Sequence, residues 1–197
     1  MSVIVRRGAA GHGVVSAAGW FALAGSAAAL VSIAVVPGPA GWLGGALAGV
    51  ATAIAAVDRR SFVIPDPLTA AGLILGLVHA AVTSGDGAIV AAVADAAMRA
   101  GVSAAVFGLL WAVYRWLRGR DGLGLGDVKL AAVAGAWLGW PIIPVAVEIA
   151  ALAALTMHAV RVHGRGRRLR ARARLPFGQS LAPAIWIGWL IEQALLG

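Results

Sequence analysis

The chain has 197 residues, of which 61% are hydrophobic and only 12% are charged, and its formal net charge is +8. Its mean hydropathy of +0.90 and its long apolar runs exclude an ordinary soluble domain and indicate a protein that crosses a membrane several times. The chain contains no cysteine, which excludes disulfides, thiolate catalysis and cysteine-ligated zinc. Its four histidines are scattered without metal-ligand spacing, so neither a metal nor another cofactor is expected.

Apolar runs joined by short loops predict an all-α bundle of about seven transmembrane helices, forming a single domain over residues 1–197. The predicted segments are 14–36, 43–57, 68–83, 88–117, 127–140, 141–160 and 181–196. Arg6 and Arg7 precede the first segment, but its apolar run is longer than the core of a signal peptide, so we expect a retained helix. Asp95 and Arg99 are four positions apart in the fourth segment and should pair on one helical face.

The distribution of basic residues predicts the topology. With a cytoplasmic amino terminus and seven crossings, all sixteen basic residues except Arg99 lie on the cytoplasmic side, and the carboxyl terminus is external. The densest basic run, Arg161 to Arg174, is expected to contact anionic lipid headgroups of a prokaryotic plasma membrane. Because no aromatic residues interleave this run, it does not indicate nucleic-acid binding.

Two aspartates stand at the ends of apolar segments, where an ionisable side chain costs roughly 2.5–3.5 kcal/mol on insertion scales. Asp58 ends the second segment and Asp127 begins the fifth, so the predicted topology brings both to the cytoplasmic face. Two carboxylates at one depth can share a proton and hold a water between them, as in aspartic proteases. The alternative is that each acid merely ends its helix. That alternative suits Asp127, because a helix start favours a negative charge. It does not suit Asp58, because the carboxyl end of a helix disfavours a negative charge, unless Arg59 or Arg60 compensates it.

The helix ends also predict which acid holds the shared proton. The carboxyl end of a helix disfavours a carboxylate at Asp58, whereas the free amides at a helix start favour one at Asp127. We therefore expect the proton mainly on Asp58, with Asp127 as the base that activates water and Asp58 as the acid that polarises the scissile carbonyl. Arg59 or Arg60 would reverse this order by turning toward Asp58.

Three motifs follow one another along this frame. Asp58 is followed by Ile-Pro-Asp at 64–66, then by Gly-Leu-Gly-Asp-Val-Lys-Leu at 124–130, and then by Leu-Pro-Phe-Gly at 175–178. Together they resemble the type IV prepilin peptidases, the G-x-G-D intramembrane aspartic proteases, over residues 43–197. The resemblance implies that Asp58 and Asp127 form a catalytic pair, which removes the leader of type IV prepilin-like proteins, after a glycine, at the cytoplasmic membrane face.

The chain departs from the family pattern in three places. The first helix, within residues 1–42, lies outside the resemblance, and Gln179 stands where the last motif usually has proline. Larger members carry a methyltransferase region with paired cysteines. This chain has no cysteine and no loop long enough for such a region, so it resembles the short, peptidase-only kind found with Flp/Tad-type pili.

The remaining motif residues are expected to meet the substrate. Gly122, Gly124 and Gly126 can adopt backbone conformations that other residues avoid, which would let a substrate strand approach Asp127; a flexible linker is the alternative. The last motif supplies a proline, an aromatic residue and a glycine, which either line the entrance to the site or start the last helix: Pro176, Phe177 and Gly178.

Four further expectations concern polar and aromatic residues outside the catalytic pair. Asp66 is predicted to be the N-cap of the third helix, with Pro67 as its first residue. Lys129 should meet headgroups rather than Asp127, which points in another direction on the helix. Glu148 is the one acid well inside a predicted helix and should pair with Arg99. Four tryptophans near predicted helix ends are read as interface anchors, namely Trp42, Trp116, Trp137 and Trp140.

Two other functions fit the paired acids. One is a different G-x-G-D protease that cuts other membrane segments. The other is a small cation- or proton-coupled transporter, because paired acids also mark ion pathways. A transporter is expected to show an internal repeat or helices broken at mid-membrane, and the sequence shows neither.

Overall fold

The computed structural model describes residues 17–85, 87–119, 124–163 and 177–196. Within these residues it consists of helices and contains no strand. Seven helices succeed one another: α1 (Ala17–Val35), α2 (Pro39–Ser61), α3 (Asp66–Thr83), α4 (Ile89–Arg118), α5 (Leu125–Trp137), α6 (Ile142–His163) and α7 (Gly178–Leu196). The predicted all-α bundle is confirmed, and the predicted boundaries differ from the observed ones by a few residues.

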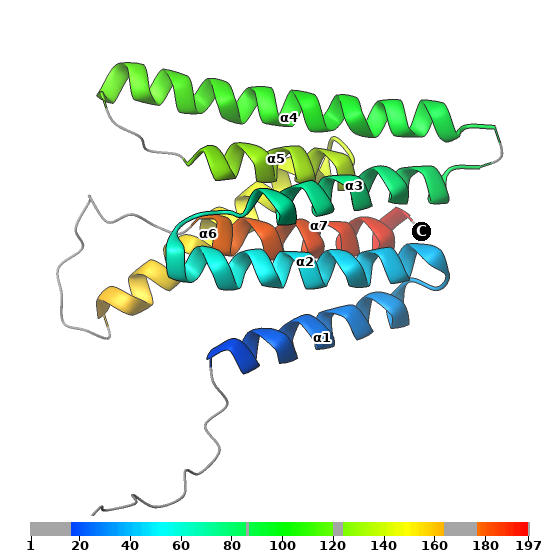
Figure 1. Cartoon of the computed structure of the whole chain (residues 1–197), viewed down its shortest axis with the longest axis horizontal. Helices are drawn as coiled ribbons and strands as arrows, with labels where there is room; N and C mark the ends of the chain where they lie inside the picture. The colour runs from blue at the N-terminus through cyan, green and yellow to red at the C-terminus, as the bar shows by residue number, and fades with distance from the viewer. Residues whose placement is uncertain (1–16, 86, 120–123, 164–176, 197) are drawn as a thin grey trace, which may run out of the picture.

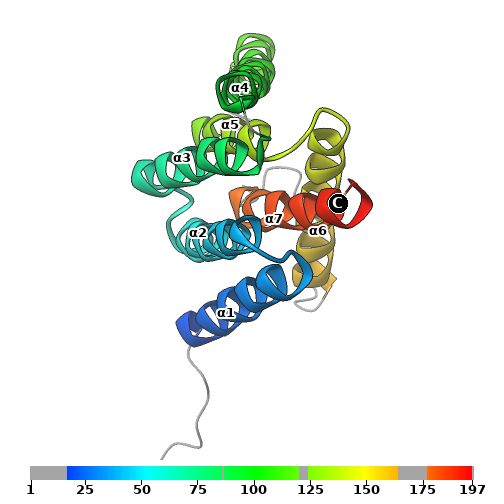
Figure 2. The same cartoon turned by 90° about the vertical axis from the view of Figure 1, so that its right-hand side faces the viewer.

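The helices run alternately up and down the long axis, so that α2 ends where α5 and α7 begin (Figure 1). Viewed along this axis, α4 and α1 form the two outer layers (Figure 2). Between them α3 lies beside α5, and α2 lies beside α7, while α6 covers one side of α7. This alternation places the end of α2, which carries Asp58, and the start of α5, which carries Asp127, at the same end of the bundle.

Five of the described helices, α1, α2, α3, α4 and α6, are long and apolar enough to cross a membrane. These helices make the chain a multi-pass membrane protein. In contrast, α5 has only 13 residues and is therefore about 20 Å long, shorter than a hydrocarbon core of about 30 Å. It packs against α3, α4 and α7 inside the bundle. Nearly all its residues from Leu130 to Trp137 are buried, so neighbouring helices rather than lipid surround it.

Close approach of small residues holds the bundle together, as is common between membrane helices. A methyl group on Gly44 of α2 would lie 2.0 Å from the ring of Trp189 in α7. A methyl group on Gly135 of α5 would lie 2.3 Å from the main-chain oxygen of Arg99 in α4. Glycine at these positions is required for space, because neither a packed indole nor a helix backbone can move aside cheaply.

The extra first helix is an integral part of the described bundle. α1 packs along α2, where Gly25 lies close to Thr52. A Cβ at Gly25 would lie 3.1 Å from the Thr52 hydroxyl oxygen, which is a tight contact. Its Ser32 is fully buried and accepts a hydrogen bond from Trp186 Nε1 of α7 at 2.9 Å. α1 therefore packs along α2 and is tied to α7 by this hydrogen bond.

Trp137 contradicts its predicted role as an interface anchor. The residue ends α5, and only 4% of its surface is exposed. Its indole Nε1 donates a hydrogen bond of 2.8 Å to the main-chain oxygen of Gly72 in α3. Because α5 is too short to reach the membrane surface, its last residue lies inside the bundle. The other three tryptophans, Trp42, Trp116 and Trp140, are exposed, and their role as interface anchors stays a prediction.

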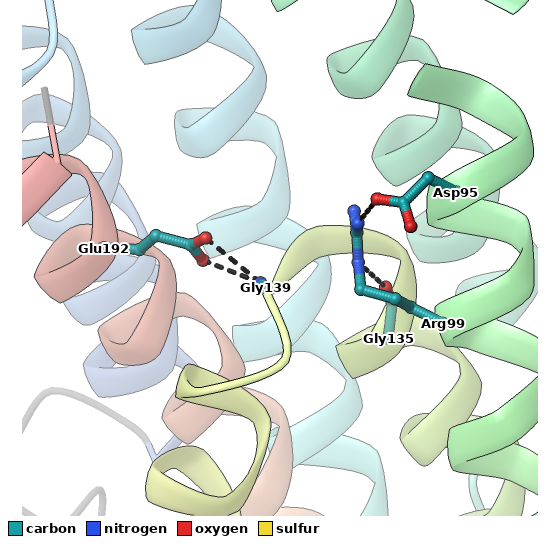
Figure 3. Close-up of polar contacts among 5 residues, drawn as sticks. All are labelled: Asp95, Arg99, Gly135, Gly139 and Glu192. Carbon is teal, nitrogen blue, oxygen red and sulfur yellow. Dashed lines mark hydrogen bonds and ion pairs between the residues drawn. The ribbon is translucent and has the colours of Figure 1, made fainter. Parts of the chain in front are cut away.

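Polar contacts hold the carboxyl-terminal end of α5 (Figure 3). Arg99 of α4 pairs with Asp95, as predicted, and its Nε donates to the main-chain oxygen of Gly135 at 3.2 Å. On the other side, both carboxylate oxygens of Glu192 in α7 accept the N–H of Gly139, at 3.0 and 3.1 Å. These contacts supply partners for groups at the end of α5 and in the turn that follows it.

The predicted pair between Arg99 and Glu148 is wrong. Glu148 lies on an exposed position of α6, whereas α4 packs against α3 and α5. Arg99 instead uses Asp95 one helical turn away. Hydropathy placed Arg99 and Glu148 at a similar depth, but depth alone does not tell which sides of two helices face each other.

Candidate active site

Asp58 lies in the last turn of α2 and is buried, with 4% of its surface exposed. α2 continues to Ser61, and Phe62 ends it in the left-handed conformation, at φ 54°, with its N–H donating to the main-chain oxygen of Asp58 at 2.9 Å. The carboxylate of Asp58 is directed to the start of α7. There its Oδ2 accepts the main-chain N–H of Gln179 at 2.7 Å.

Asp127 is the third residue of α5 and is also buried, with 7% exposed. Its Oδ2 accepts the main-chain N–H of Gly124, the residue just before the helix, at 3.1 Å. Asp127 therefore does close the start of its own helix, in the manner of the acidic residue of a capping box. This contact uses one acceptor site on one oxygen, so a carboxylate with about four such sites can also take part in chemistry.

A single isoleucine side chain lies between the start of α5 and the start of α7. Ile64, in the connection between α2 and α3, is 7% exposed. A methyl group on Gly126 would lie 2.9 Å from its Cδ1, and a methyl group on Gly178 would lie 2.5 Å from the same atom. The first turns of α5 and α7 therefore contact the same side chain. The buried carboxylates of Asp58 and Asp127 are thus each hydrogen-bonded beside a helix start that contacts Ile64.

The structure corrects the reason for the glycines. Gly124 has ordinary extended angles, φ −79° and ψ 145°, and Gly126 lies within α5. Neither adopts a conformation that requires glycine. Gly126 is needed because Ile64 occupies the space of a side chain. Gly122 and Pro176 lie outside the described residues.

The two arginines after Asp58 do not compensate its charge by an ion pair in the described part of the chain. The guanidinium of Arg59 lies over the ring of Phe21 in α1, 5.8 Å from its centroid, in a cation–π arrangement. Arg60 is exposed. α1, the helix outside the family pattern, thus binds the arginine that directly follows Asp58.

The helix ends no longer distinguish the two acids. Asp58 belongs to the carboxyl end of α2, but its carboxylate meets the amino-terminal turn of α7 through Gln179. Asp127 meets the amino-terminal turn of α5 through Gly124. Both carboxylates therefore accept a main-chain N–H from a helix start, which favours the ionised form of each. The assignment of the shared proton to Asp58 stays a prediction, without the asymmetry on which it was based.

Asp66 is not the N-cap of α3. It is the first residue of that helix, Pro65 occupies the cap position, and no side chain caps the helix. Instead the carboxylate of Asp66 pairs with Lys129 of α5, and both side chains are largely exposed. Lys129 does not pair with Asp127, and this absence was predicted. Its ammonium group instead pairs with the carboxylate of Asp66, 63 positions away in the sequence. An exposed pair of this kind contributes about 0–1 kcal/mol.

The start of α7 contributes a group that the sequence pattern did not reveal. The main-chain oxygen of Phe177 accepts the N–H groups of Ser180 and Leu181, at 2.9 Å each. Gly178 is buried beside Asp58, and a methyl group there would lie 3.2 Å from Asp58 Oδ2. Gln179 entered the sequence analysis only as a departure from the usual proline. A proline at this position would have no N–H for Asp58.

Comparisons with known proteins show which family the chain resembles. The model of the type IV leader peptidase family matches residues 45–158, a stretch that contains both aspartates. A prepilin leader peptidase/N-methyltransferase of Dickeya chrysanthemi is 38% identical over 151 residues, covering 73% of this chain and 48% of that protein. One of Aeromonas hydrophila is 34% identical over 176 residues, covering 82% and 55%. The leader peptidase HopD of Escherichia coli is 35% identical over 133 residues, covering 67% and 82%.

The fold and the site define a helical membrane bundle with two buried acids at one end. The matches place the chain in a family: it belongs to the type IV leader peptidases. It spans about half the length of the two peptidase/N-methyltransferases. No solved structure matches the chain.

Proposed function

We propose that the chain is an aspartic endopeptidase that removes the leader of type IV prepilin-like proteins, with Asp58 and Asp127 as its catalytic acids. One observation carries the proposal: segments far apart in the sequence bring two buried carboxylates to one site around Ile64. Each carboxylate is held by a main-chain N–H through Oδ2. Family membership and the names of the relatives support the substrate class.

The chemistry follows from two acids that share one proton. The ionised carboxylate takes a proton from a water held between the acids, and the protonated one donates a hydrogen bond to the scissile carbonyl. The water oxygen forms a bond to the carbonyl carbon, and the negative charge develops on the carbonyl oxygen. When the tetrahedral intermediate collapses, the C–N bond breaks and the leaving amine takes up a proton from the pair.

The substrate segment would pass the starts of α5 and α7. Five residues there are proposed to bind it: Gly124, Gly126, Pro176, Phe177 and Gly178. The proposal is supported by the position of Gly124 and Gly178, each beside one of the acids. The apolar helix of the prepilin would then lie in the membrane alongside the bundle. The transporter alternative is not favoured, because both acids lie at one end of the bundle rather than at its middle.

The chain is further proposed to act as a peptidase without methyltransferase activity. This chain matches only about half the length of relatives whose names include N-methyltransferase, 48% in one and 55% in another. HopD, named as a leader peptidase alone, is matched over 82% of its length. Co-expression with a prepilin from the same genome tests both parts by mass spectrometry. Loss of the leader without a gain of 14 Da, the mass of one methylene added by methylation, is expected; an unprocessed prepilin contradicts the proposal.

The proposed orientation has the amino terminus in the cytoplasm and the carboxyl terminus outside, in the plasma membrane of a prokaryote. It rests on the basic residues that precede α1 and follow α6, and Arg161 to Arg174 is proposed to contact anionic headgroups. Because the chain has no cysteine, single cysteines at Gly164 and Gly197 can be labelled cleanly. An impermeant thiol reagent added to intact cells should label position 197 but not 164; equal labelling of both contradicts this topology.

A further inference from the structure

Two polar side-chain atoms at the start of α7 are buried without a hydrogen-bond partner among the described residues: Gln179 Oε1 and Ser180 Oγ. Ser180 is only 5% exposed, so bulk water does not satisfy its hydroxyl. Buried polar side chains in native proteins nearly always have a partner, and leaving one without is unfavourable. Two such atoms on neighbouring residues therefore indicate that a bound molecule supplies their partners.

These two atoms lie beside the proposed catalytic pair. The main-chain N–H of Gln179 donates to Asp58 Oδ2 at 2.7 Å. A methyl group on Gly178 would lie 3.2 Å from the same oxygen. The first turn of α7 thus meets Asp58 through its main chain, while the polar side chains of Gln179 and Ser180 are left for other contacts.

The side chain of Gln179 has one weak contact among the described residues. Its Nε2 lies 3.9 Å from Met157 Sδ of α6, and a thioether is a weak acceptor. This contact turns the amide nitrogen toward α6 and leaves Oε1, which can only accept hydrogen bonds, for a donor. The family pattern usually has proline at this position, and proline has no polar side chain. We therefore expect the acceptor to affect which substrate this chain prefers, and not the reaction that the family shares.

We propose that the first turn of α7 is a subsite for the main chain of the substrate, in which Gln179 Oε1 accepts an N–H and Ser180 Oγ donates to a carbonyl oxygen. This inference rests on the proposed function, which brings a peptide to Asp58. Neighbouring side chains of a helix point about 100° apart, so the two contacts fall on different peptide groups. A peptide offers one carbonyl oxygen per residue and one N–H per non-proline residue, so a segment that passes Asp58 presents several of each.

A group kept for binding differs from a structural group in its effect on stability. Removing an unpartnered buried atom relieves an unfavourable burial in the free protein, whereas removing a partnered atom leaves its partner unsatisfied. Ser32 of α1 supplies the comparison, because it is fully buried and hydrogen-bonded to both Ala28 and Trp186. Substitutions in the subsite should therefore weaken substrate binding without weakening the fold.

Three variants of the full chain in lipid nanodiscs test these effects: Gln179→Met, Ser180→Ala and the control Ser32→Ala. Gln179→Met keeps the main-chain N–H to Asp58 and the length of the side chain. For the two subsite variants we expect KM for a prepilin to rise about three- to tenfold, with kcat within about twofold of wild type. Their thermal unfolding midpoints should stay unchanged or rise by up to about 4 °C. Ser32→Ala should lower the midpoint and leave KM unchanged.

Ester substitution in the substrate identifies the N–H that Gln179 accepts. A synthetic prepilin segment that includes the apolar helix carries an ester oxygen in place of one amide N–H at a time, outside the scissile bond. At one position the ester should raise KM about three- to tenfold for the wild-type chain but less than about twofold for Gln179→Met, which has already lost that contact. Esters at the other positions should affect both chains equally.

Four results would decide against these conclusions. A wild-type KM in either subsite variant would overturn the proposed subsite. Midpoints that fall as far as in Ser32→Ala would also overturn it, because the two atoms would then have structural partners such as ordered water. So would an ester series without a position at which the effect depends on Gln179. A wild-type chain that cleaves no prepilin would instead reject the proposed function itself, and this result is distinct from cleavage with an unchanged KM.

Discussion

The charged residues near the two ends of α5 differ in their partners. At its carboxyl end, the cation Arg99 is paired with Asp95 and hydrogen-bonded to the main-chain oxygen of Gly135. At its amino end, Asp127 is buried, as is Asp58 near the same end of the bundle. Neither of these two acids forms an ion pair within the described residues. Arg99, Asp58 and Asp127 are all largely buried, and an uncompensated buried charge is costly.

This difference teaches how to tell a structural charge from a reactive one in a membrane bundle. Paired and hydrogen-bonded charges at the carboxyl end of α5 tie helices together. Two neighbouring acids with only main-chain donors favour a single ionisation, which would keep one proton available for transfer. On the proposed function, the amino end of α5 carries the chemistry and the carboxyl end anchors the helix.

The largest effect is expected when one acid of the proposed catalytic pair is removed. Asp58→Asn and Asp127→Asn should each reduce cleavage by at least about a thousandfold, and the double variant should be no worse than either, because the two act as a unit. Each variant should remain inserted and folded. Leader removal near the wild-type rate in either variant would falsify the catalytic pair.

Asp66→Asn is the matched control for these variants. Asp66 lies near the same end of the bundle but is exposed and paired with Lys129. Its substitution should leave cleavage within about twofold of wild type and cost no more than about 1 kcal/mol in stability. A folded Asp66→Asn variant that fails to cleave would bring Asp66 into the active site.

The second test concerns the spacing of the two acids around Ile64. Gly178→Ala forces a methyl group against Ile64 Cδ1 and Asp58 Oδ2. We expect about a tenfold to hundredfold loss of cleavage, with a destabilisation of about 1–3 kcal/mol from overpacking. Shortening the obstructing side chain in Gly178→Ala/Ile64→Val should restore part of the activity. Failure of this rescue in a folded double variant would show that Ile64 does not set the spacing.

Gly49→Ala is the control for the glycine series. Gly49 lies in the same helix as Asp58, and a methyl group there meets nothing within 4 Å. Alanine should be neutral to stabilising by up to about 1 kcal/mol, because it lowers the backbone entropy of the unfolded chain. Cleavage should be unchanged. Activity loss in this variant would mean that helix flexibility, rather than space at the site, governs the effect of Gly178→Ala.

The third test concerns the carboxyl end of α5. Arg99→Met removes the partner of both Asp95 and the Gly135 carbonyl and should destabilise the protein by about 1–3 kcal/mol. Because these groups hold α5 without touching the reaction, cleavage per folded molecule should fall by less than about fivefold. Denaturation in mild detergent and single-turnover cleavage measure the two effects separately. A stable Arg99→Met variant without activity would make the carboxyl end of α5 part of the mechanism.

The smallest effect is expected for Glu148→Gln. Glu148 is exposed on α6 and forms no ion pair with Arg99 within the described residues; Arg99 pairs with Asp95 instead. Removing the charge of Glu148 should change stability by less than about 0.5 kcal/mol, as is usual for exposed positions. A destabilisation comparable to that of Arg99→Met would mean that Glu148 belongs to the network at the carboxyl end of α5 after all.

The sequence predicted the helices of this protein better than the contacts between them. The seven helices and the common end for Asp58 and Asp127 followed from hydropathy, because an apolar run must cross or enter the bilayer and alternate runs return to the same side. The pair between Asp95 and Arg99 also followed, since helical spacing is a local property. Predictions that required knowledge of a facing helix were wrong: the N-cap role of Asp66, the interface position of Trp137 and the partner of Glu148.

The candidate site shows the same division. Its two acids could be identified because each interrupts an apolar pattern within a few residues, and the three ordered motifs indicated the family. The role of Ile64 could not be predicted, because it depends on contact with glycines 62 and 114 positions away. Nor could the contact of Gln179 with Asp58, although its position directly after the last motif was a signal worth following.

The sequence by itself determined that this chain is a multi-pass helical membrane protein with two acids at one end, because hydropathy and charge act on each segment separately. Only the tertiary structure decided which groups hold those acids, since hydrogen bonds and van der Waals contacts require atoms within a few ångströms whatever their separation along the chain. Asp58 illustrates the point. From sequence its carboxylate belongs to the unfavourable end of α2, but the packing of α7 brings it a main-chain N–H from a helix start.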